Sequence, residues 1–237
     1  MQISGSTAFV TGANRGLGRH LAEQLLERGA TVYAGARDPT SVDLPGAIPV
    51  AIDITDPASV AAAAEVASDA TIVINNAGIE TGTSVLEGSL DDVRREFDVH
   101  VFGTLDVVRA FRPALVRASG GGAVLNVLSA LSWISFPQTG AYCAAKSASW
   151  SMTNALRQEL APEGVAVTAL HVGYMDTDMT AGVDAPKSDP AVVARLALDG
   201  IEAGDHEVLA DDVSRQVQGG LAGGVGALYP QLAGARA

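Results

Sequence analysis

The chain has 237 residues, of which 48% are hydrophobic and 5% aromatic, and its formal net charge is −12. This length allows a large buried core, and no linker-like stretch divides it, so we predict one domain over 1–237. The acidic balance disfavours nucleic acid and anionic lipid as partners. We find no charged leader and no apolar stretch long enough to span a bilayer, so a soluble, cytoplasmic protein is expected. The one cysteine, Cys143, cannot form an intramolecular disulfide, which suits a reducing compartment.

Apolar runs and helix-like patterns alternate along the chain almost from its first residue. In chain order, strands are predicted at 7–10, 31–34, 48–52, 71–74, 123–128, 165–171 and 206–209. Helices are predicted over about 17–26, where leucines recur every four positions, and over 56–67 and 142–160. A further long helical stretch is expected after Ser89, bent or broken near Gly103 and Pro113. The glycine-rich end at 219–226 is expected to be loosely ordered.

This alternation predicts an α/β fold. Repeated strand–helix units form a parallel sheet with right-handed crossovers, here a Rossmann-like, doubly wound sheet of seven strands with helices on both faces. Ligands of such sheets bind beyond the carboxyl ends of the strands. Several polar or glycine-rich segments follow predicted strands, namely 11–18, Asp53, 75–78, Ser129 and 171–173. We therefore expect these segments to share one cleft.

The first of these segments is the turn Thr11-Gly12-Ala13-Asn14-Arg15-Gly16-Leu17-Gly18. Its three glycines allow a tight turn and a close approach to a pyrophosphate, whose charge the following helix N-terminus favours. The spacing differs from the common G-x-G-x-x-G pattern, and such a turn can also simply connect a strand to a helix. Its place in the first strand–helix unit, ahead of the other cleft segments, favours dinucleotide binding.

The end of the second strand indicates which dinucleotide is bound. An acidic residue about twenty positions after the turn would accept hydrogen bonds from the ribose of NAD. The sequence there reads Ala36-Arg37-Asp38, so Ala36 offers no acceptor and Arg37 could bind a 2′-phosphate bidentately. Arg15 in the glycine turn adds a second cation, and NADP is predicted. Two alternatives stay open: both arginines could be solvated surface charges, and a small change of register could bring Asp38 to the ribose.

Ser129, Tyr142 and Lys146 form a candidate acid–base set. Tyr142 and Lys146 lie four residues apart on one predicted helix, so their side chains share a face. The ammonium favours the phenolate, as would an oxidised nicotinamide, so Tyr142 can exchange a proton with the oxygen of a carbonyl or an alcohol. Ser129 could hold the same oxygen by a hydrogen bond. Together with the glycine turn, this set predicts a nicotinamide-dependent oxidoreductase.

These motifs resemble those of the compact, single-domain short-chain dehydrogenase/reductase family, and the similarity runs from about Thr7 to Met179. The resemblance implies direct hydride transfer, with Lys146 also holding the nicotinamide ribose. It implies a cofactor site that comprises Gly12, Asn14, Arg15, Gly16, Leu17, Gly18, Arg37, Asp53, Ile54, Asn75, Ala77, Gly78, Tyr142, Lys146, Gly173, Met175 and Thr177. Many relatives form dimers or tetramers through two long helices, here about 102–117 and 142–160, so a homodimer or homotetramer is expected.

The chain departs from the family pattern at two positions. The family usually has an asparagine in place of His100, where its main-chain carbonyl helps to position a water in a proton relay to the lysine. His100 keeps the carbonyl and adds a titratable ring, so either group could serve a catalytic relay. Val172 replaces the usual proline before Gly173, which would loosen the nicotinamide loop. Neither change removes a group that contacts the transferred hydride or proton.

The predicted substrate is a modest-sized hydrophobic carbonyl compound or alcohol. Trp133, Tyr174 and Met179, with Ser129 and Tyr142, are expected to line its pocket, and 180–190 is expected to form a mobile lid. The main prediction is a carbonyl reductase or an alcohol dehydrogenase. A non-catalytic dinucleotide-binding scaffold and an epimerase or dehydratase of the same fold are the alternatives. The histidines and the cysteine show no metal-ligand spacing, so no metal is predicted.

Overall fold

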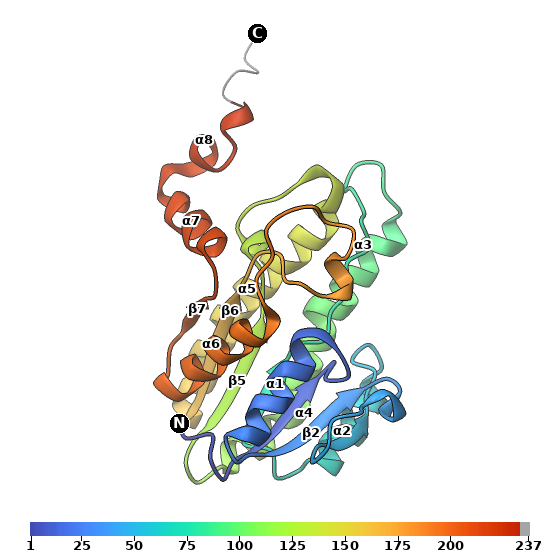
Figure 1. Cartoon of the computed structure of the whole chain (residues 1–237), viewed down its shortest axis with the longest axis vertical. Helices are drawn as coiled ribbons and strands as arrows, with labels where there is room; N and C mark the ends of the chain where they lie inside the picture. The colour runs from blue at the N-terminus through green and yellow to red at the C-terminus, as the bar shows by residue number, and fades with distance from the viewer. Residues whose placement is uncertain (233–237) are drawn as a thin grey trace.

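A computed structural model describes residues 1–232 of the chain, and these residues contain a seven-stranded sheet (Figure 1). The strand order is β3-β2-β1-β4-β5-β6-β7, and each neighbouring pair is parallel. The strands are β1 (Thr7–Thr11), β2 (Thr31–Ala36), β3 (Ile48–Ala51), β4 (Ile72–Asn75), β5 (Gly122–Val127), β6 (Val165–His171) and β7 (Glu207–Leu209). The order reverses between β1 and β4, which places a ligand crevice at their carboxyl ends. The predicted fold class is confirmed.

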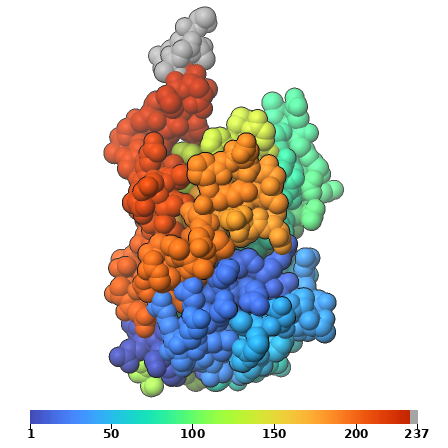
Figure 2. All heavy atoms as spheres, in the orientation of Figure 1, coloured from blue at the N-terminus to red at the C-terminus, as the bar shows by residue number. Residues whose placement is uncertain are grey.

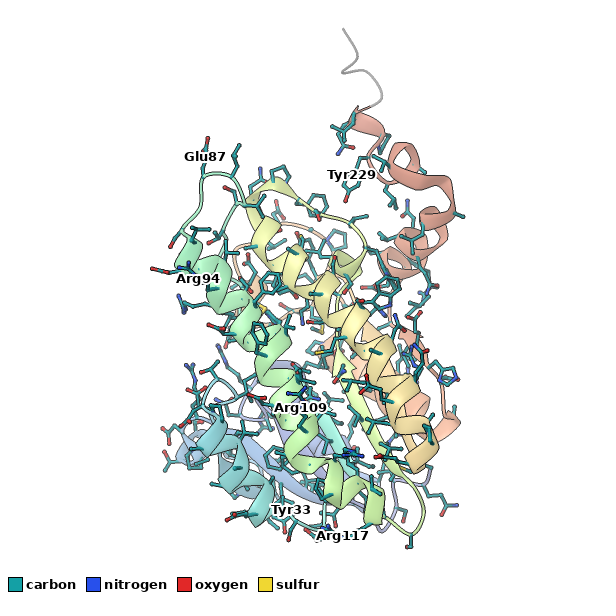
Figure 3. The ribbon with its side chains drawn as sticks, turned by 180° about the vertical axis from the view of Figure 1, so that it is seen from behind. Tyr33, Glu87, Arg94, Arg109, Arg117 and Tyr229 are labelled. Atoms are coloured by element: carbon teal, nitrogen blue, oxygen red, sulfur yellow. The ribbon has the colours of Figure 1, made fainter. Side chains whose placement is uncertain are left out.

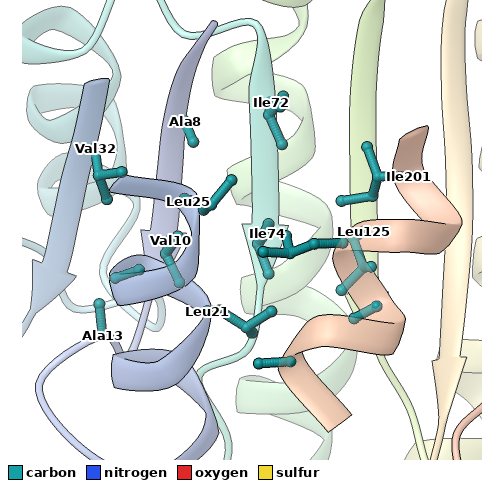
Figure 4. Close-up of a cluster of buried hydrophobic side chains, with 14 of the residues drawn as sticks. Ala8, Val10, Ala13, Leu21, Leu25, Val32, Ile72, Ile74, Leu125 and Ile201 are labelled. Carbon is teal, nitrogen blue, oxygen red and sulfur yellow. The ribbon is translucent and has the colours of Figure 1, made fainter. Parts of the chain in front are cut away.

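Each face of the sheet packs against its own helices, because successive strand residues point to opposite faces. Ala8 and Val10 belong to the apolar core under α1 (Gly16–Glu27) and α6 (Pro190–Ala203) (Figure 4). Phe9 belongs to the second core, under α2 (Pro57–Val66), α4 (Thr104–Arg117) and α5 (Gly140–Leu160) (Figure 3). Because both faces are covered, the strands are nearly continuous apolar runs.

The helical stretch after Ser89 changes its hydrogen-bonding pattern along its length. Ser89 caps α3 (Leu90–Phe97), and a π-helical segment, η2 (Asp98–Gly103), leads from α3 into α4. The structure therefore has an irregularity near Gly103, as predicted. The helix was expected to be bent or broken at Pro113, and it is not broken there, because α4 continues through this residue. Pro113 has no N–H to donate to the carbonyl of Arg109, and Arg109 is exposed to solvent. Phe111 and other buried residues of α4 hold the helix on the sheet.

The C-terminal third of the chain is more helical than the sequence pattern suggested. Helix α6 was not predicted, although Asp189 caps it and its buried residues recur at helical spacing: Val193, Ala194, Ala197, Leu198 and Ile201. The glycine-rich end forms α7 (Asp212–Gly220), η7 (Leu221–Gly223), α8 (Gly224–Leu228) and η8 (Pro230–Leu232), so the expectation of a loosely ordered end is wrong. Asp211 caps α7 through the N–H of Ser214 and fixes the start of this helix.

Residues 212–232, here named the C-terminal arm, project beyond the rest of the molecule (Figure 2). Tyr229 on this arm (Figure 3) accepts a hydrogen bond at its hydroxyl from the backbone N–H of Ser135, at 2.8 Å. The other connections contain short 3₁₀ segments: η1 (Pro39–Ser41), η3 (Ala130–Ser132), η4 (Pro137–Thr139), η5 (Ala161–Glu163) and η6 (Asp178–Thr180). Throughout residues 1–232, no helix has the combined length and apolar character that crossing a bilayer would require.

Candidate active site

The glycine turn brings α1 very close to the ends of β1 and β4. Gly12 and Gly16 have φ angles of 65° and 53°, in the left-handed region that favours glycine. A Cβ on Gly18 would lie 2.2 Å from the carbonyl oxygen of Gly12 and 2.4 Å from Nδ2 of Asn76. An alanine at this position would therefore have to displace either the turn or the helix.

Thr11 and Asn76 hold the turn in place. Oγ1 of Thr11 accepts hydrogen bonds from the backbone N–H groups of Asn76 (2.9 Å) and Ala77 (3.0 Å). Nδ2 of Asn76 donates to the carbonyl oxygens of Thr11 (2.9 Å) and Gly12 (3.1 Å). The predicted cofactor set contains neither side chain. Their places at the ends of two adjacent predicted strands are the signal that could have identified them.

The N-terminus of α1 is suited to an anion. Arg15 occupies its N-cap position, and no side chain among residues 1–232 caps the helix, whereas Asp56, Asp189 and Asp211 cap α2, α6 and α7. The first N–H groups of α1 lack intrahelical partners, and the helix dipole favours negative charge there. A left-handed glycine turn followed by an uncapped helix fits the pyrophosphate of a dinucleotide.

The predicted 2′-phosphate site lies at the end of β2, where Arg37 and Asp38 are both exposed. The Asp38 carboxylate accepts hydrogen bonds from the hydroxyl (2.6 Å) and the backbone N–H (3.0 Å) of Thr40. These two bonds lower the pKa of Asp38 and tie its carboxylate to the start of η1. Arg15, the second predicted cation, forms an ion pair with Asp178 at 3.0 Å.

Asp53, which belongs to the predicted cofactor site, follows β3. Its carboxylate accepts hydrogen bonds from the hydroxyl (2.7 Å) and the N–H (2.9 Å) of Thr55, which lower its pKa. Leu17 and Ile54, from the predicted cofactor set, have buried side chains, so their contribution would come from the backbone.

Ser129, Tyr142 and Lys146 come together beyond the carboxyl end of β5. Ser129 begins η3, and its Oγ accepts a hydrogen bond from the N–H of Leu131 at 3.1 Å. Nζ of Lys146 lies 5.6 Å from the centre of the Tyr142 ring and donates to the carbonyl of Val127 at 2.8 Å. Hydrogen bonding by the hydroxyl of Ser129 lowers the pKa of the Tyr142 phenol.

Burial dominates the protonation of this set. It raises the pKa of the Tyr142 phenol well above its ordinary value, against the opposing effect of Ser129, and the charge of Glu96 adds to the rise. Burial also lowers the pKa of the Lys146 ammonium to about 8, although Glu96 opposes this shift. In the chain alone, desolvation is the largest effect on the phenol, and the expected support of the phenolate by Lys146 does not overcome it. Tyr142 is protonated at neutral pH.

His100 lies in η2 with its ring edge-on to Tyr142, at 5.3 Å between ring centres and 89° between planes. Its Nε2 lies 2.8 Å from the carbonyl oxygen of Ile79 and 3.3 Å from Oε2 of Glu96. Since a carbonyl only accepts, Nε2 carries the proton. Burial lowers the pKa of the ring, which is consequently neutral. The carbonyl of His100 accepts a hydrogen bond from Oγ of Ser149 at 2.8 Å.

A small polar cavity of about 10 Å³ lies beside Lys146 and is lined by Asn75, Ala77, His100, Thr104, Asn126, Val127, Leu128, Lys146, Ser149 and Thr153. Nδ2 of Asn75 donates to Oδ1 of Asn126 (2.8 Å), whose Nδ2 donates to Oγ1 of Thr153 (2.9 Å). Oδ1 of Asn75 is buried and has no hydrogen-bond partner among the described residues. The cavity is polar and close to the size of one water molecule.

The segment that follows β6 folds back on itself, so that two of its residues pair. Met175 and Ser188 form a parallel bridge, so the residues between them make a loop with a closed base. The N–H of Gly173 donates to Oδ2 of Asp211 at 2.7 Å, and Oγ of Ser188 donates to the same oxygen at 3.3 Å. Asp211 thus ties the predicted nicotinamide segment to the start of α7. It was absent from the predicted set, although an acidic residue before a helix is a recognisable N-cap signal.

The cofactor turn and this loop also approach each other, because a Cβ on Gly16 would lie 3.4 Å from Cγ2 of Thr177. An open cleft of about 410 Å³ adjoins them and is lined by Arg15, Gly78, Ile79, Glu80, Thr81, Asp92, Arg95, Asp178 and Met179. Met179 and Tyr174, both predicted to contact substrate, expose 49% and 39% of their surface. Trp133 does not share this exposure: it is 8% exposed and stacks on the His171 ring, behind Ser129. The indole buries its large apolar surface in the core, and the structure does not support a substrate contact for it.

A doubly wound sheet whose first turn fits a pyrophosphate, with a tyrosine, a lysine and a serine beside it, defines a dinucleotide-dependent oxidoreductase. Comparison with known proteins agrees. The family model described as short chain dehydrogenase matches residues 6–188. Sorbitol dehydrogenase from Cereibacter sphaeroides is 32% identical over 199 residues, which cover 80% of this chain and 78% of that protein.

Two solved structures extend the comparison. A short chain dehydrogenase from Burkholderia cenocepacia in complex with NADP has 43% identity and a TM-score of 0.92, covering 98% of this chain and 99% of that one. The 3-ketoacyl-(acyl-carrier-protein) reductase from Brucella melitensis complexed with NADH has 26% identity and a TM-score of 0.80, with 88% and 95% covered. The chain belongs to the short-chain dehydrogenase/reductase family, whose members are oxidoreductases that use a nicotinamide cofactor.

Proposed function

We propose that the protein is an NADP(H)-dependent carbonyl reductase that acts on a small hydrophobic ketone or aldehyde and oxidises the corresponding alcohol in reverse. The observation that carries this proposal is the protonated phenol of Tyr142 beside the hydroxyl of Ser129, one helical turn from Lys146. A phenol that stays protonated at neutral pH suits the donation of a proton to a carbonyl oxygen.

The three residues divide the work at the substrate oxygen. A dinucleotide held by the glycine turn and Lys146 would supply the hydride that the carbonyl carbon accepts. Oγ of Ser129 donates a hydrogen bond to the carbonyl oxygen, and Tyr142 transfers its phenolic proton to this oxygen as negative charge develops there. The substrate becomes an alcohol, and the tyrosine becomes a phenolate. The ammonium of Lys146 stabilises that phenolate, because an opposite charge a few ångströms away in a buried site interacts strongly.

The polar cavity behind Lys146 supports a route for returning a proton to Tyr142. Its volume of about 10 Å³ suits one water, and the unpaired Oδ1 of Asn75 supplies an acceptor for it. The carbonyl of His100 offers a second acceptor on this route, because one of its lone pairs is free after the hydrogen bond from Ser149. The His100 ring has a different task, since its Nε2–H is committed to Ile79. We therefore assign the relay to the His100 carbonyl and not to its ring.

The preference for NADP rests on the end of β2. Arg37 is exposed there next to Ala36, and the Asp38 carboxylate is occupied by Thr40. Arg37→Ala should weaken NADPH binding at least about tenfold and leave NADH almost unchanged, because a hydrogen bond to a charged group contributes about 1.5–3 kcal/mol. Ala36→Asp should shift the preference toward NADH. Equal efficiency of the wild-type enzyme with the two cofactors, or a preference for NADH, would contradict this assignment.

A hydrophobic substrate is supported by the exposed side chains near the cleft. Met179 presents apolar surface on the loop between Met175 and Ser188, and Tyr174 does so immediately before this loop. We propose that 180–190 acts as a lid, hinged where the bridge closes the base of the loop.

The deciding experiment measures NADPH consumption against a panel of ketones and aldehydes, with Tyr142→Phe as the control. A reductase consumes NADPH with at least one apolar member of the panel, and the variant does not. A scaffold protein of the same fold would bind NADPH without consuming it, and that result would reject the proposal.

A homodimer or homotetramer is supported by apolar exposure along η2 and α4. Phe102 and Val116 expose 57% and 42% of their surface on this side of the molecule. Burying both between copies would remove that surface from water. Light scattering tests the proposal: the wild-type protein should have a multiple of the 24.1 kDa chain mass, and Phe102→Glu should lower it.

A further inference from the structure

His171 is the last residue of β6, and its ring lies directly behind the catalytic serine. The side chain is fully buried. Its Nδ1 lies 3.2 Å from the carbonyl oxygen of Ser129. The hydride and proton transfers described above do not involve this ring, so its placement against the backbone of Ser129 has another cause.

The ring is held from several elements. It stacks on Trp133, with 3.9 Å between ring centres and 15° between planes. Its Nε2 lies 3.7 Å from Oε1 of Glu207 on β7. The same carboxylate accepts hydrogen bonds from Nε1 of Trp150 on α5 (3.0 Å) and from Nε2 of Gln218 on α7 (2.8 Å). The orientation of the imidazole is therefore fixed by groups on either side of it.

The contacts also decide which nitrogen carries the proton. Burial lowers the pKa of His171, and the cations Lys146 and Arg157 act in the same direction, against the carbonyl of Ser129 and the carboxylate of Glu207. The ring is neutral at physiological pH and has one N–H. Because the Ser129 carbonyl only accepts, this N–H is at Nδ1.

The hydrogen bond from His171 comes from another part of the chain, whereas three other hydrogen bonds of Ser129 are local. The N–H of Ser129 donates to Oγ of Ser132 (3.3 Å), its carbonyl accepts from the N–H of Ser132 (3.0 Å), and its Oγ accepts from the N–H of Leu131. These three partners belong to the turn that Ser129 itself begins, so they would move with it. Two further bonds reach the residue after β6: Oγ of Ser129 donates to the carbonyl of Val172 at 3.4 Å, and the N–H of Ala130 donates to the same carbonyl at 3.0 Å. His171 is the last residue of β6, which lies between β5 and β7, and with Val172 it anchors the turn from outside.

We propose that His171 is a positioning residue, which holds the Ser129 carbonyl through Nδ1–H and thereby keeps the serine hydroxyl directed at the substrate oxygen. This inference rests on the proposed reductase function. Displacement of a catalytic group by about 1 Å can cost about 10²-fold in rate, so a turn that is free to tilt would lose much of the serine's contribution.

The test compares substitutions that keep or remove the donor. His171→Leu removes both ring nitrogens, and His171→Asn keeps an N–H close to the place of Nδ1. We expect His171→Leu to lower the single-turnover rate of NADPH oxidation at least about tenfold, with NADPH affinity within about twofold of wild type, and His171→Asn to recover most of the rate. His206→Leu is the matched control, because His206 is exposed. The rate of this variant should equal that of the wild-type enzyme.

A double-mutant cycle separates positioning from a general loss of structure. In a Ser129→Ala background the hydroxyl is absent, so His171→Leu should lower the residual rate by less than about twofold. A merely structural role would give the same loss in both backgrounds, and this result would overturn the proposal. If His171→Leu does not fold, as judged by thermal unfolding, His171→Gln with the same cycle replaces it, since its donor lies at the Nε2 place and should not rescue.

The outcomes distinguish this inference from the proposed function. An active wild-type enzyme with full activity in folded His171→Leu would refute the positioning role alone. A wild-type protein without turnover on any carbonyl compound would refute both.

Discussion

Replacement of Gly18 by alanine tests whether the close packing of the glycine turn serves the cofactor. The added Cβ would lie 2.2 Å from the carbonyl oxygen of Gly12 and 2.4 Å from Nδ2 of Asn76, both shorter than real Cβ contacts. The start of α1 must therefore move by roughly 1 Å, a displacement large enough to disturb a binding geometry.

The size of the effect follows from the bonds that this movement breaks. Nδ2 of Asn76 donates to the carbonyls of Gly12 and Thr11, and both bonds lie at the displaced contact. Each contributes about 0.5–1.5 kcal/mol net, so their loss should cost about 1–3 kcal/mol, or roughly 5- to 150-fold in NADPH affinity if it falls on binding. In the absence of the clash, alanine would instead stabilise the helix by about 1 kcal/mol relative to glycine.

NADPH titration by calorimetry and thermal unfolding measure the two parts of this prediction. Gly219→Ala on α7 is the matched control, because among residues 1–232 no atom beyond its chain neighbours and the adjacent backbone of its own helix lies within 4 Å of the Cβ that it adds. We expect Gly219→Ala to raise or preserve the melting temperature and to bind NADPH as wild type does. If Gly18→Ala behaved in the same way, the argument from close packing would be refuted.

Three further substitutions test the catalytic set. Tyr142→Phe should lower turnover by about 10²–10⁴-fold and leave NADPH binding nearly unchanged, because only the acidic proton is lost; more than half of wild-type activity in kinetic assays would contradict its role. Lys146→Met should change the pH dependence of stability. The folded pKa of about 8 lies below the ordinary 10.5, so the unfolded chain binds more protons between these values, and the lysine's contribution to stability rises with pH there. The free energy of unfolding of Lys146→Met relative to wild type should fall between pH 8 and 10.5, and a constant difference would refute this. His100→Asn should keep substantial activity and a similar pH–rate profile, whereas loss of an inflection below the ordinary imidazole pKa of about 6.5, with the fold intact, would show that the ring shuttles protons.

The alternation of elements could be predicted because its signals are local. Buried parallel strands are short apolar runs, and Asp56 and Ser89 mark helix starts by capping them. The glycines of the C-terminal arm favour a loosely ordered end, but its first helix forms because Asp211 caps it. No break occurs at Pro113, because Arg109, whose carbonyl loses its helical partner, is an exposed residue and tertiary packing holds the helix.

The site was predictable only where its residues are close in sequence or part of a motif. Tyr142 and Lys146 lie one turn apart on a single helix, and their relation could be predicted from spacing alone. The roles of Asn76, Asp211 and His171 depend on contacts between strands and helices that are distant in the chain. The shift of the Tyr142 pKa could not be predicted either, because burial belongs to the packed structure and not to the local sequence.

The uncapped start of α1 also affects the protein between catalytic cycles. A ligand that binds only the folded chain stabilises it by about 2.7 kcal/mol when its free concentration is 100 times its Kd. Since no side chain among residues 1–232 caps α1, the phosphates of a dinucleotide would complete the hydrogen bonding of that helix. The resistance of the protein to thermal unfolding should therefore rise and fall with the concentration of its dinucleotide.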